Sequence, residues 1–267
     1  MVIDLAEVCG QEAARRALEV AATGGHSLML IGPAGAGKSL LARCLPGLLP
    51  PDAPRPVRVP GMHLTPRGVA REFTLAAGGT LLLDDLPVLR PATLRALAEA
   101  FDGDHEPLQL VATMRPCPCG HAGDHRTDCT CRAGQVRRWR ARVGAPLAER
   151  FDLFVAVPAV TLGEIRRGAG EPSARVVARV AAARAVQIRR GGPNAAMGLG
   201  EVARRCRLDT AGRALLDAAF ERLGLSAAAL HRVLRVARTL ADLAGAERLG
   251  AAHVAEAVQY RPEEARW

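Results

Sequence analysis

Aromatic residues and lysine are both scarce in this chain of 267 residues. Phe, Trp and Tyr together make up 3% of the sequence, which leaves few rings on which unpaired nucleic-acid bases could stack. Lys38 is the single lysine among 36 basic residues, and the others are arginine. The formal net charge of +9 is therefore compatible with a bias of composition or with a polyanion-binding face, and the sequence leaves both interpretations open.

Long apolar runs and an export signal are also missing. No apolar run reaches the roughly 18 residues that a membrane-spanning helix needs, and the first four residues carry no charged-then-apolar pattern. Seven cysteines in a chain of this length do not indicate a disulfide scaffold, which is typical of short exported proteins. Metal binding or buried thiols fit better, and we expect a cytoplasmic protein with no membrane partner.

The strongest motif is a glycine-rich loop that fits G-x-x-x-x-G-K-[ST] without a mismatch. Residues 27–31 before it predict a buried strand, and residues 39–45 after it predict a helix that ends at Pro46. In such a loop, backbone N–H groups surround phosphate oxygens, Lys38 neutralises the β- and γ-phosphate charge, and the Ser39 hydroxyl ligates Mg²⁺. The predicted phosphate-binding residues are Gly32, Pro33, Ala34, Gly35, Ala36, Gly37, Lys38 and Ser39.

An acidic strand end supplies the second part of a nucleotide site. Residues 80–83 are apolar apart from Thr80, and Asp84 and Asp85 follow directly. We predict that Asp84 holds Mg²⁺ and that Asp85 is the catalytic base that orients the attacking water.

The remaining pattern predicts an α/β fold with a second, helical part. Apolar runs at 108–114 and 153–157 add buried parallel strands, and residues 57–59 are a weaker candidate for an edge strand. After Pro158 the apolar spacing becomes helical. Helices are expected near 173–190, 209–223, 226–244 and 251–260, with N-caps at Ser173, Asp209 and Ser226. We expect a P-loop sheet domain over residues 1–162 and a smaller helical domain over residues 170–262, with the boundary in the glycine-containing segment 162–172.

Four cysteines form the second strong signal. Cys117 and Cys119 make one C-x-C pair, and Cys129 and Cys131 make another, within a loop at residues 117–131. Four thiolates from two short turns can surround one tetrahedral Zn²⁺, which would be structural because cysteine fills every position. Free thiols are the alternative, and His121 and His125 are substitute ligands.

Several of these segments together resemble the magnesium-chelatase-related AAA+ ATPases of the ComM/YifB group. They are the phosphate loop, the acidic strand, and residues 114–120, 145–153 and 233–243, and the resemblance runs from about residue 10 to residue 262. It implies a P-loop AAA+ sheet domain followed by a helical lid, with ATP bound between subunits. It also implies a homo-oligomer, usually a hexameric ring, or a hetero-oligomer with a paralogue. The group's N-terminal protease-like domain has no counterpart in this sequence.

The resemblance also implies roles for individual residues. Arg150 matches an arginine finger, a catalytic group that reaches the γ-phosphate in the next subunit. Ala228 stands where relatives have a lid arginine, so Arg235 or Arg232 is expected to contact the nucleotide instead. Asp85 stands where relatives have glutamate, and Arg115 replaces a sensor asparagine. The segment 102–107 is expected to form a tight turn where relatives insert a hairpin.

Three functions follow as hypotheses. The first is an AAA+ ATPase that couples ATP binding and hydrolysis to DNA remodelling, as in branch migration during transformation or recombination. The second is an ATP- and zinc-binding scaffold subunit that hydrolyses ATP weakly or not at all, because the residues at positions 85, 115 and 228 depart from the family pattern. The third is the motor subunit of a metal chelatase.

Overall fold

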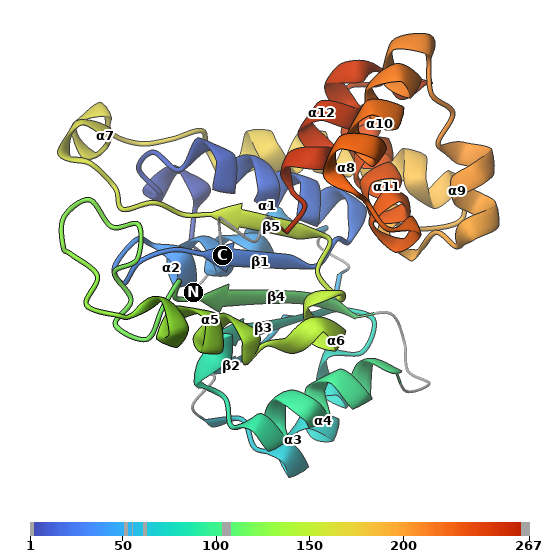
Figure 1. Ribbon diagram of the computed structural model, residues 1–267. Helices are drawn as coiled ribbons and strands as arrows, with labels where there is room; N and C mark the ends of the chain where they lie inside the picture. The colour runs from blue at the N-terminus through green and yellow to red at the C-terminus, as the bar shows by residue number, and fades with distance from the viewer. Residues whose placement is uncertain (1–2, 51–52, 55, 61–62, 103–107, 263–267) are drawn as a thin grey trace.

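A parallel five-stranded sheet forms the centre of the molecule (Figure 1). The computed structural model describes residues 3–50, 53–54, 56–60, 63–102 and 108–262. The strand order is β2-β3-β4-β1-β5. The strands are β1 (Leu28–Ile31), β2 (Val57–Pro60), β3 (Thr80–Asp84), β4 (Gln109–Met114) and β5 (Leu153–Ala156). The turn predicted at 102–107 lies outside the described residues, apart from Asp102.

The predicted strands are confirmed to within one residue at each end. All residues of β1 and β4 are buried, as is expected of parallel strands that are covered on both faces. The run at 57–59 is indeed an edge strand, since β2 pairs only with β3 among the described strands. The α/β fold class predicted from the sequence is therefore confirmed.

Helices cover the two faces of the sheet. Leu28 and Leu30 face a core that includes α1 and α2, whereas Met29 and Ile31 face a core that includes α3, α4 and α6. The helices of this part of the chain are α1 (Glu12–Gly24), α2 (Lys38–Cys44), α3 (Pro66–Ala76), α4 (Pro91–Asp102), α5 (Ala133–Ala141), α6 (Gly144–Ala148) and α7 (Leu162–Arg167). Short 3₁₀ segments lie at Leu5–Glu7, Leu45–Leu48, Leu86–Val88 and Asn194–Ala196.

The rest of the chain is helical and packs beside α1, near the end of the sheet where the strands begin (Figure 1). It contains α8 (Ser173–Arg189), α9 (Leu199–Arg205), α10 (Thr210–Leu223), α11 (Ala227–Leu243) and α12 (Ala251–Gln259). Side chains of α8 and α11, such as Val180 and Leu240, belong to the same buried cluster as Leu18 of α1. One continuous apolar core therefore joins the helical part to the sheet.

Of the helices after Pro158, two were not predicted. Helix α7 occupies the segment expected to be a loose boundary, because Thr161 and Glu164 form a capping box at its start. Helix α9 is only seven residues long. Among the described residues, no helix is long and apolar enough to cross a membrane.

The predicted N-caps give two correct assignments and one error. Asp209 and Ser226 accept hydrogen bonds from the N–H groups of Gly212 and Ala229 and cap α10 and α11. Ser173 is instead the first residue of α8. Its hydroxyl accepts the Leu5 N–H at 2.7 Å, and its own N–H donates to Asp4. The Ser173 hydroxyl therefore bonds to a residue 168 positions away in sequence, and not to an N–H group of its own helix as the local pattern predicted.

Candidate functional site

The glycine-rich loop lies between β1 and α2, in the strand-loop-helix order that the motif predicts. Gly32 has no room for a side chain, since a Cβ there would lie 1.9 Å from the Val157 carbonyl oxygen. Gly35 and Gly37 have φ angles of +74° and +91°, which side chains rarely tolerate. The loop thus requires glycine at these three positions, for close packing at the first and for backbone conformation at the others.

Lys38 lies inside this loop. Its Nζ donates to the carbonyl oxygens of Gly32 and Pro33 at 2.8 and 2.7 Å, and the residue is buried. Burial lowers the pKa of Lys38 to about 8, while the nearby Asp85 carboxylate acts in the opposite direction. The side chain is therefore protonated at neutral pH, and the carbonyl groups of the loop hold its Nζ in place.

Asp85 adopts an unusual backbone conformation at the end of β3. Its φ angle is +52°, and its N–H donates to the Thr113 hydroxyl on β4 at 2.8 Å. Carboxylate oxygen Oδ2 accepts a hydrogen bond from Arg115 Nε at 2.8 Å. Oxygen Oδ1 is buried and has no hydrogen-bond partner among the described residues. Only one of the two carboxylate oxygens, Oδ2, therefore has a hydrogen-bond partner among the described residues.

Each of the two predicted acids has an arginine partner. Asp84 pairs with Arg58 of the adjacent strand β2, with Nη2 2.5 Å and Nε 3.1 Å from the same oxygen. Asp85 pairs with Arg115, whose guanidinium also lies 5.1 Å from the centre of the Trp139 ring and donates to the Pro118 carbonyl oxygen. The resemblance put Arg115 at the position of a sensor asparagine, and the sequence predicted neither ion pair. The Arg58–Asp84 pair follows from the pairing of β2 with β3, which only the fold reveals.

The oxygen donors in this region fit Mg²⁺. Ser39 follows Lys38 in the first turn of α2, and Lys38 is close enough to Asp84 and Asp85 for their charges to influence its pKa. Carboxylate and hydroxyl oxygens are the ligands that Mg²⁺ prefers, and the unpartnered Oδ1 of Asp85 is an available acceptor. Ser39 and Asp84 are the ligands that the sequence predicts, and Arg58 occupies one carboxylate oxygen of Asp84 in this structure.

Gln11 is a residue of this region that sequence reasoning missed. It precedes α1 with a φ angle of +59°, and its buried side-chain amide donates to the Pro158 carbonyl at 2.7 Å and the Ala36 carbonyl at 3.4 Å. It therefore ties the phosphate loop to the segment after β5. A lone glutamine carries no motif, so only the fold reveals this contact.

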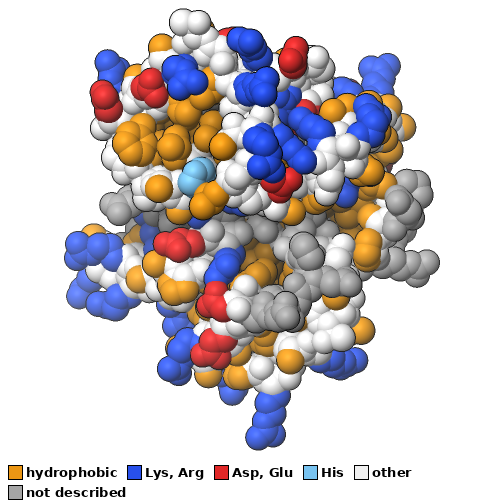
Figure 2. Space-filling view, turned by 90° about the vertical axis from the view of Figure 1, so that its right-hand side faces the viewer, with side chains coloured by type: hydrophobic (Ala, Val, Ile, Leu, Met, Phe, Trp, Pro, Cys, Tyr) orange, Lys and Arg blue, Asp and Glu red, His pale blue; other side chains and the backbone are white. Residues whose placement is uncertain are grey.

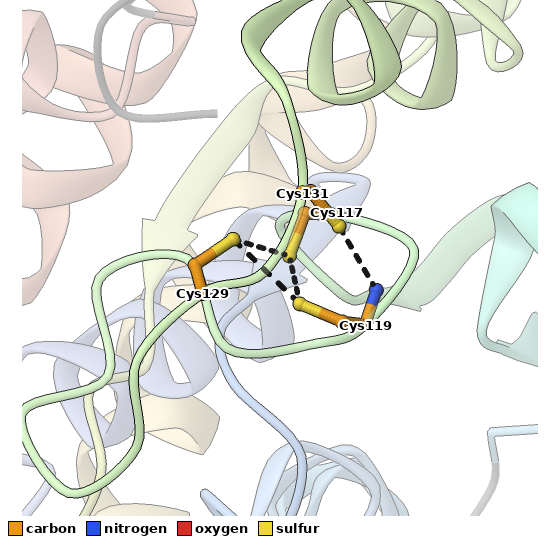
Figure 3. Close-up of side chains that lie close together, drawn as sticks. All are labelled: Cys117, Cys119, Cys129 and Cys131. Carbon is orange, nitrogen blue, oxygen red and sulfur yellow. Dashed lines mark hydrogen bonds between the residues drawn. The ribbon is translucent and has the colours of Figure 1, made fainter.

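The four cysteines converge in the loop between β4 and α5, as their spacing predicts (Figure 3). The Cys117 sulfur is 3.4 Å from that of Cys119 and 3.7 Å from that of Cys129, and all four sulfurs lie within 4.8 Å of one another. A tetrahedral Zn²⁺ with bonds of about 2.3 Å separates its sulfur ligands by about 3.8 Å. The cluster therefore has the donor set and nearly the dimensions of a Zn(Cys)₄ site.

Backbone N–H groups support thiolates in this cluster. The Ala122 N–H donates to the Cys117 sulfur at 3.3 Å, and the Cys119 N–H donates to the Cys131 sulfur at 3.4 Å. Hydrogen bonds from the backbone of His121 and, less strongly, of Thr130 lower the pKa of the Cys119 thiol to about 5. A thiolate is the form that binds metal. Desolvation and the neighbouring sulfurs raise the pKa of the Cys129 and Cys131 thiols, so Cys119 is the cysteine that is ionised first in the metal-free cluster.

Arg150 and Arg235 lie at the opposite end of the sheet from the phosphate loop. Arg150 pairs with Asp102, and Arg235 Nη2 is 3.6 Å from Asp152, just before β5 begins. The length of β1 puts about 16 Å between this end of the sheet and Gly32. Within one chain, therefore, neither arginine joins Lys38, and the structure does not bring the whole predicted set together.

A cleft of about 810 Å³ opens at this end of the sheet, between the sheet and α8. Arg150, Arg184 and Arg235 line it, together with Asp152. Figure 2 looks onto this end of the molecule, where many Lys and Arg side chains gather on the upper, helical part. With one lysine in the chain, this basic surface consists almost entirely of arginine.

The sheet, the glycine-rich loop after β1 and the acidic strand β3, which β4 separates from β1, define a P-loop protein of the α/β class. The family model for magnesium chelatase, subunit ChlI, matches residues 4–57 and 64–165, and that for the C-terminal part of the same subunit matches residues 170–261. The chain therefore belongs to the magnesium chelatase ChlI family.

Curated relatives support the same placement. The competence protein ComM of Haemophilus influenzae is 33% identical over 97% of this chain and 60% of its own length. The uncharacterized proteins YifB of Escherichia coli and Salmonella typhimurium are 34% and 35% identical, with the same coverage. The chain thus spans about three fifths of the length of these relatives.

Proposed function

We propose that this chain binds ATP with Mg²⁺ and, as part of an oligomer, couples its hydrolysis to the remodelling of DNA. The observation that carries ATP binding is the phosphate loop, in which a buried Lys38 faces the acidic end of β3. Backbone N–H groups at the start of α2 and the Lys38 ammonium would hold the phosphates. Ser39 and Asp84 would hold Mg²⁺, which neutralises charge on the transferred phosphoryl group.

The assembly part of the proposal rests on Arg150 and Arg235. Both are at the end of the sheet away from the phosphate loop of their own chain and line the cleft there. If that face meets the phosphate loop of a neighbouring copy, both guanidinium groups approach its nucleotide. The arrangement suits a closed ring, because each contact joins two different surfaces. A hexamer, or a ring shared with a paralogue, is the form we propose.

The DNA part of the proposal rests on similarity to a competence protein and on the arginine-rich surface of the helical part. Arginine binds phosphate groups through two parallel hydrogen bonds, which suits a surface that contacts nucleic acid. We place zinc in the cysteine cluster as a structural ion, and the division into a sheet domain and a helical lid at residues 162–170 belongs to the same proposal.

The test is ATP hydrolysis by zinc-loaded protein with and without branched DNA. We expect turnover that DNA raises and that Lys38→Ala abolishes, because the substitution removes the cation from the phosphate loop. Arg137→Ala, at an exposed arginine of α5, is the matched control and should keep both properties. Absence of any ATP or ADP affinity in the wild-type protein would overturn the proposal.

One observation favours the second candidate function, a nucleotide-binding scaffold with little turnover. Arg115 occupies Oδ2 of Asp85, so the proposed base is engaged in an ion pair. Arginine has no acceptor with which to orient water. A scaffold of this kind would bind ATP, form the oligomer and leave hydrolysis to a partner.

A further inference from the structure

The cysteine loop contacts the phosphate loop through both polar backbone groups of one residue, Ala34. The Ala34 N–H donates to the Gly120 carbonyl oxygen at 3.2 Å, and the Ala34 carbonyl accepts from Arg126 Nη2 at 3.2 Å. Gly120 and Arg126 both lie between the two cysteine pairs. The cysteine loop thus fixes the orientation of the peptide groups on either side of Ala34.

Arg126 is itself held firmly. Asp124, whose side chain is 1% exposed, accepts bonds of 3.0 Å from Arg126 Nε, Nη2 and the backbone N–H. His121 Nδ1 lies 3.5 Å from the same carboxylate. A guanidinium held at two nitrogens keeps a defined direction, so Arg126 transmits the position of its loop to Ala34.

Gly120 makes the second link and directly follows the metal-binding candidate Cys119. Its φ angle is +87°, and a Cβ there would lie 3.3 Å from Arg115 Cδ and 3.5 Å from Ala34 Cβ. Arg115, the partner of Asp85, also donates to the Pro118 carbonyl oxygen of the same loop at 3.2 Å. The position of Gly120 therefore depends on the cysteine cluster and affects both the phosphate loop and the Arg115–Asp85 pair.

We propose that Gly120 and Arg126 are positioning residues that couple metal binding at the cysteine cluster to nucleotide binding in the phosphate loop. The inference rests on the proposed ATP binding. A bound metal orders the cysteine loop, and the loop holds Ala34 in place before the nucleotide arrives. Coupling between two sites is reciprocal, so the nucleotide must raise the affinity for zinc by the same factor.

The experiment measures both affinities on the full chain. The affinity for the non-hydrolysable analogue AMP-PNP with Mg²⁺ is measured in zinc-loaded and zinc-stripped protein. The affinity for zinc is measured by competition with a chromogenic chelator, with and without AMP-PNP. We expect each ligand to strengthen the other about tenfold, within the usual range of such coupling. Arg126→Gln should retain zinc and weaken the coupling, because it removes one of the two contacts with Ala34, whereas Arg137→Gln should keep the full coupling.

The outcomes separate this inference from the proposed function. If zinc-loaded wild-type protein does not bind AMP-PNP, the proposed function fails. If it binds AMP-PNP equally well with and without zinc, or if Arg126→Gln keeps the full reciprocal effect, the coupling alone is overturned. If zinc-stripped protein unfolds, the AMP-PNP affinities of zinc-loaded Arg126→Gln and zinc-loaded wild type are compared instead, and equal affinities overturn the coupling.

Discussion

The Lys38 side chain is buried, so its ammonium group loses contact with water even when no phosphate is bound. The negative charge of a phosphate would compensate for this loss of hydration. Burial lowers the pKa of Lys38 to about 8. A nucleotide phosphate beside it favours the charged form and raises that pKa. Above pH 8, therefore, nucleotide binding must take up a proton, whereas below pH 8 the free protein already carries it.

We predict that the titration of Lys38 leaves the affinity for MgADP unchanged below pH 8. Above pH 8 the affinity should fall by up to about tenfold for each pH unit. Titrations between pH 7 and 9.5 test this, since the phosphates of ADP are fully ionised over that range. Residual binding by Lys38→Arg should lack the effect, because arginine stays charged. A constant wild-type affinity up to pH 9.5 contradicts the prediction.

The ion pair between Arg115 and Asp85 makes a second residue-scale prediction. Arg115→Asn frees the carboxylate and supplies an amide oxygen that can accept a hydrogen bond. In the double variant Arg115→Asn/Asp85→Glu, we expect ATP turnover to rise by up to about 10²-fold. Glutamate is longer than aspartate by about 1 Å, and a misplacement of that size slows a reaction by about this factor. Single-turnover hydrolysis at saturating ATP measures it. Arg138→Asn, at an exposed arginine of α5, should leave turnover unchanged, and a lower rate in Arg115→Asn would mean that the arginine assists hydrolysis.

At the residue scale, the sequence predicted the motifs well and the partners of their residues poorly. The glycine loop and the two C-x-C pairs are local patterns, and the structure has the loop and the converging sulfurs in the expected places. The Arg58–Asp84 pair depends instead on the register of β2 against β3, which brings together residues 26 positions apart. No local pattern specifies that register.

Helix α11 connects the helical part to the start of the sheet through buried polar groups. His26, which is fully buried, lies with Nδ1 3.3 Å from Asp152 and Nε2 2.8 Å from the Thr239 hydroxyl. Asn194 donates to the same hydroxyl at 3.0 Å and to Asp242 at 2.8 Å. The strands were predictable as short apolar runs, but this network was not, because its polar residues are scattered through the sequence and only the fold assembles them.

Asp242 is the anionic centre of this network. Its side chain is 1% exposed and accepts bonds from Arg190 and from the buried Arg238. Asp242→Ala leaves the Arg238 charge buried without its partner, and we expect it to lower the free energy of unfolding by about 3–5 kcal/mol. Urea denaturation measures the loss. Asp217→Ala, at an exposed position on α10, should stay within about 0.5 kcal/mol of wild type, and a similarly small effect at Asp242 would contradict the prediction.

At the scale of the whole molecule, the parts of the candidate site lie at two ends of one sheet. The sequence resemblance implied that Arg150 acts on a nucleotide bound by another subunit, and the fold supplies a geometric reason. Arg150 precedes β5 and Lys38 follows β1, so two neighbouring parallel strands separate them. An isolated chain therefore has Lys38 and Asp85 at one end of the sheet and Arg150 at the other, and should hydrolyse ATP poorly.

This separation makes a prediction about mixtures. Lys38→Ala should bind no nucleotide, whereas Arg150→Ala should bind ATP with wild-type affinity and lose turnover, typically by 10³-fold or more for an arginine finger. Each variant alone lacks one half of every site. In a mixed ring, an Arg150→Ala subunit that binds ATP can face the intact Arg150 of a Lys38→Ala neighbour, so one complete site forms at that contact.

Equal mixtures of the two variants should therefore recover part of the wild-type turnover, and the recovery should increase with total protein concentration because it requires assembly. Steady-state hydrolysis across a dilution series measures this. Lys38→Ala mixed with the double variant Lys38→Ala/Arg150→Ala is the control and should stay inactive. If instead Arg150→Ala lowers nucleotide affinity as strongly as Lys38→Ala, or if the mixture stays inactive at concentrations where wild-type protein is oligomeric, Arg150 does not act across a subunit contact.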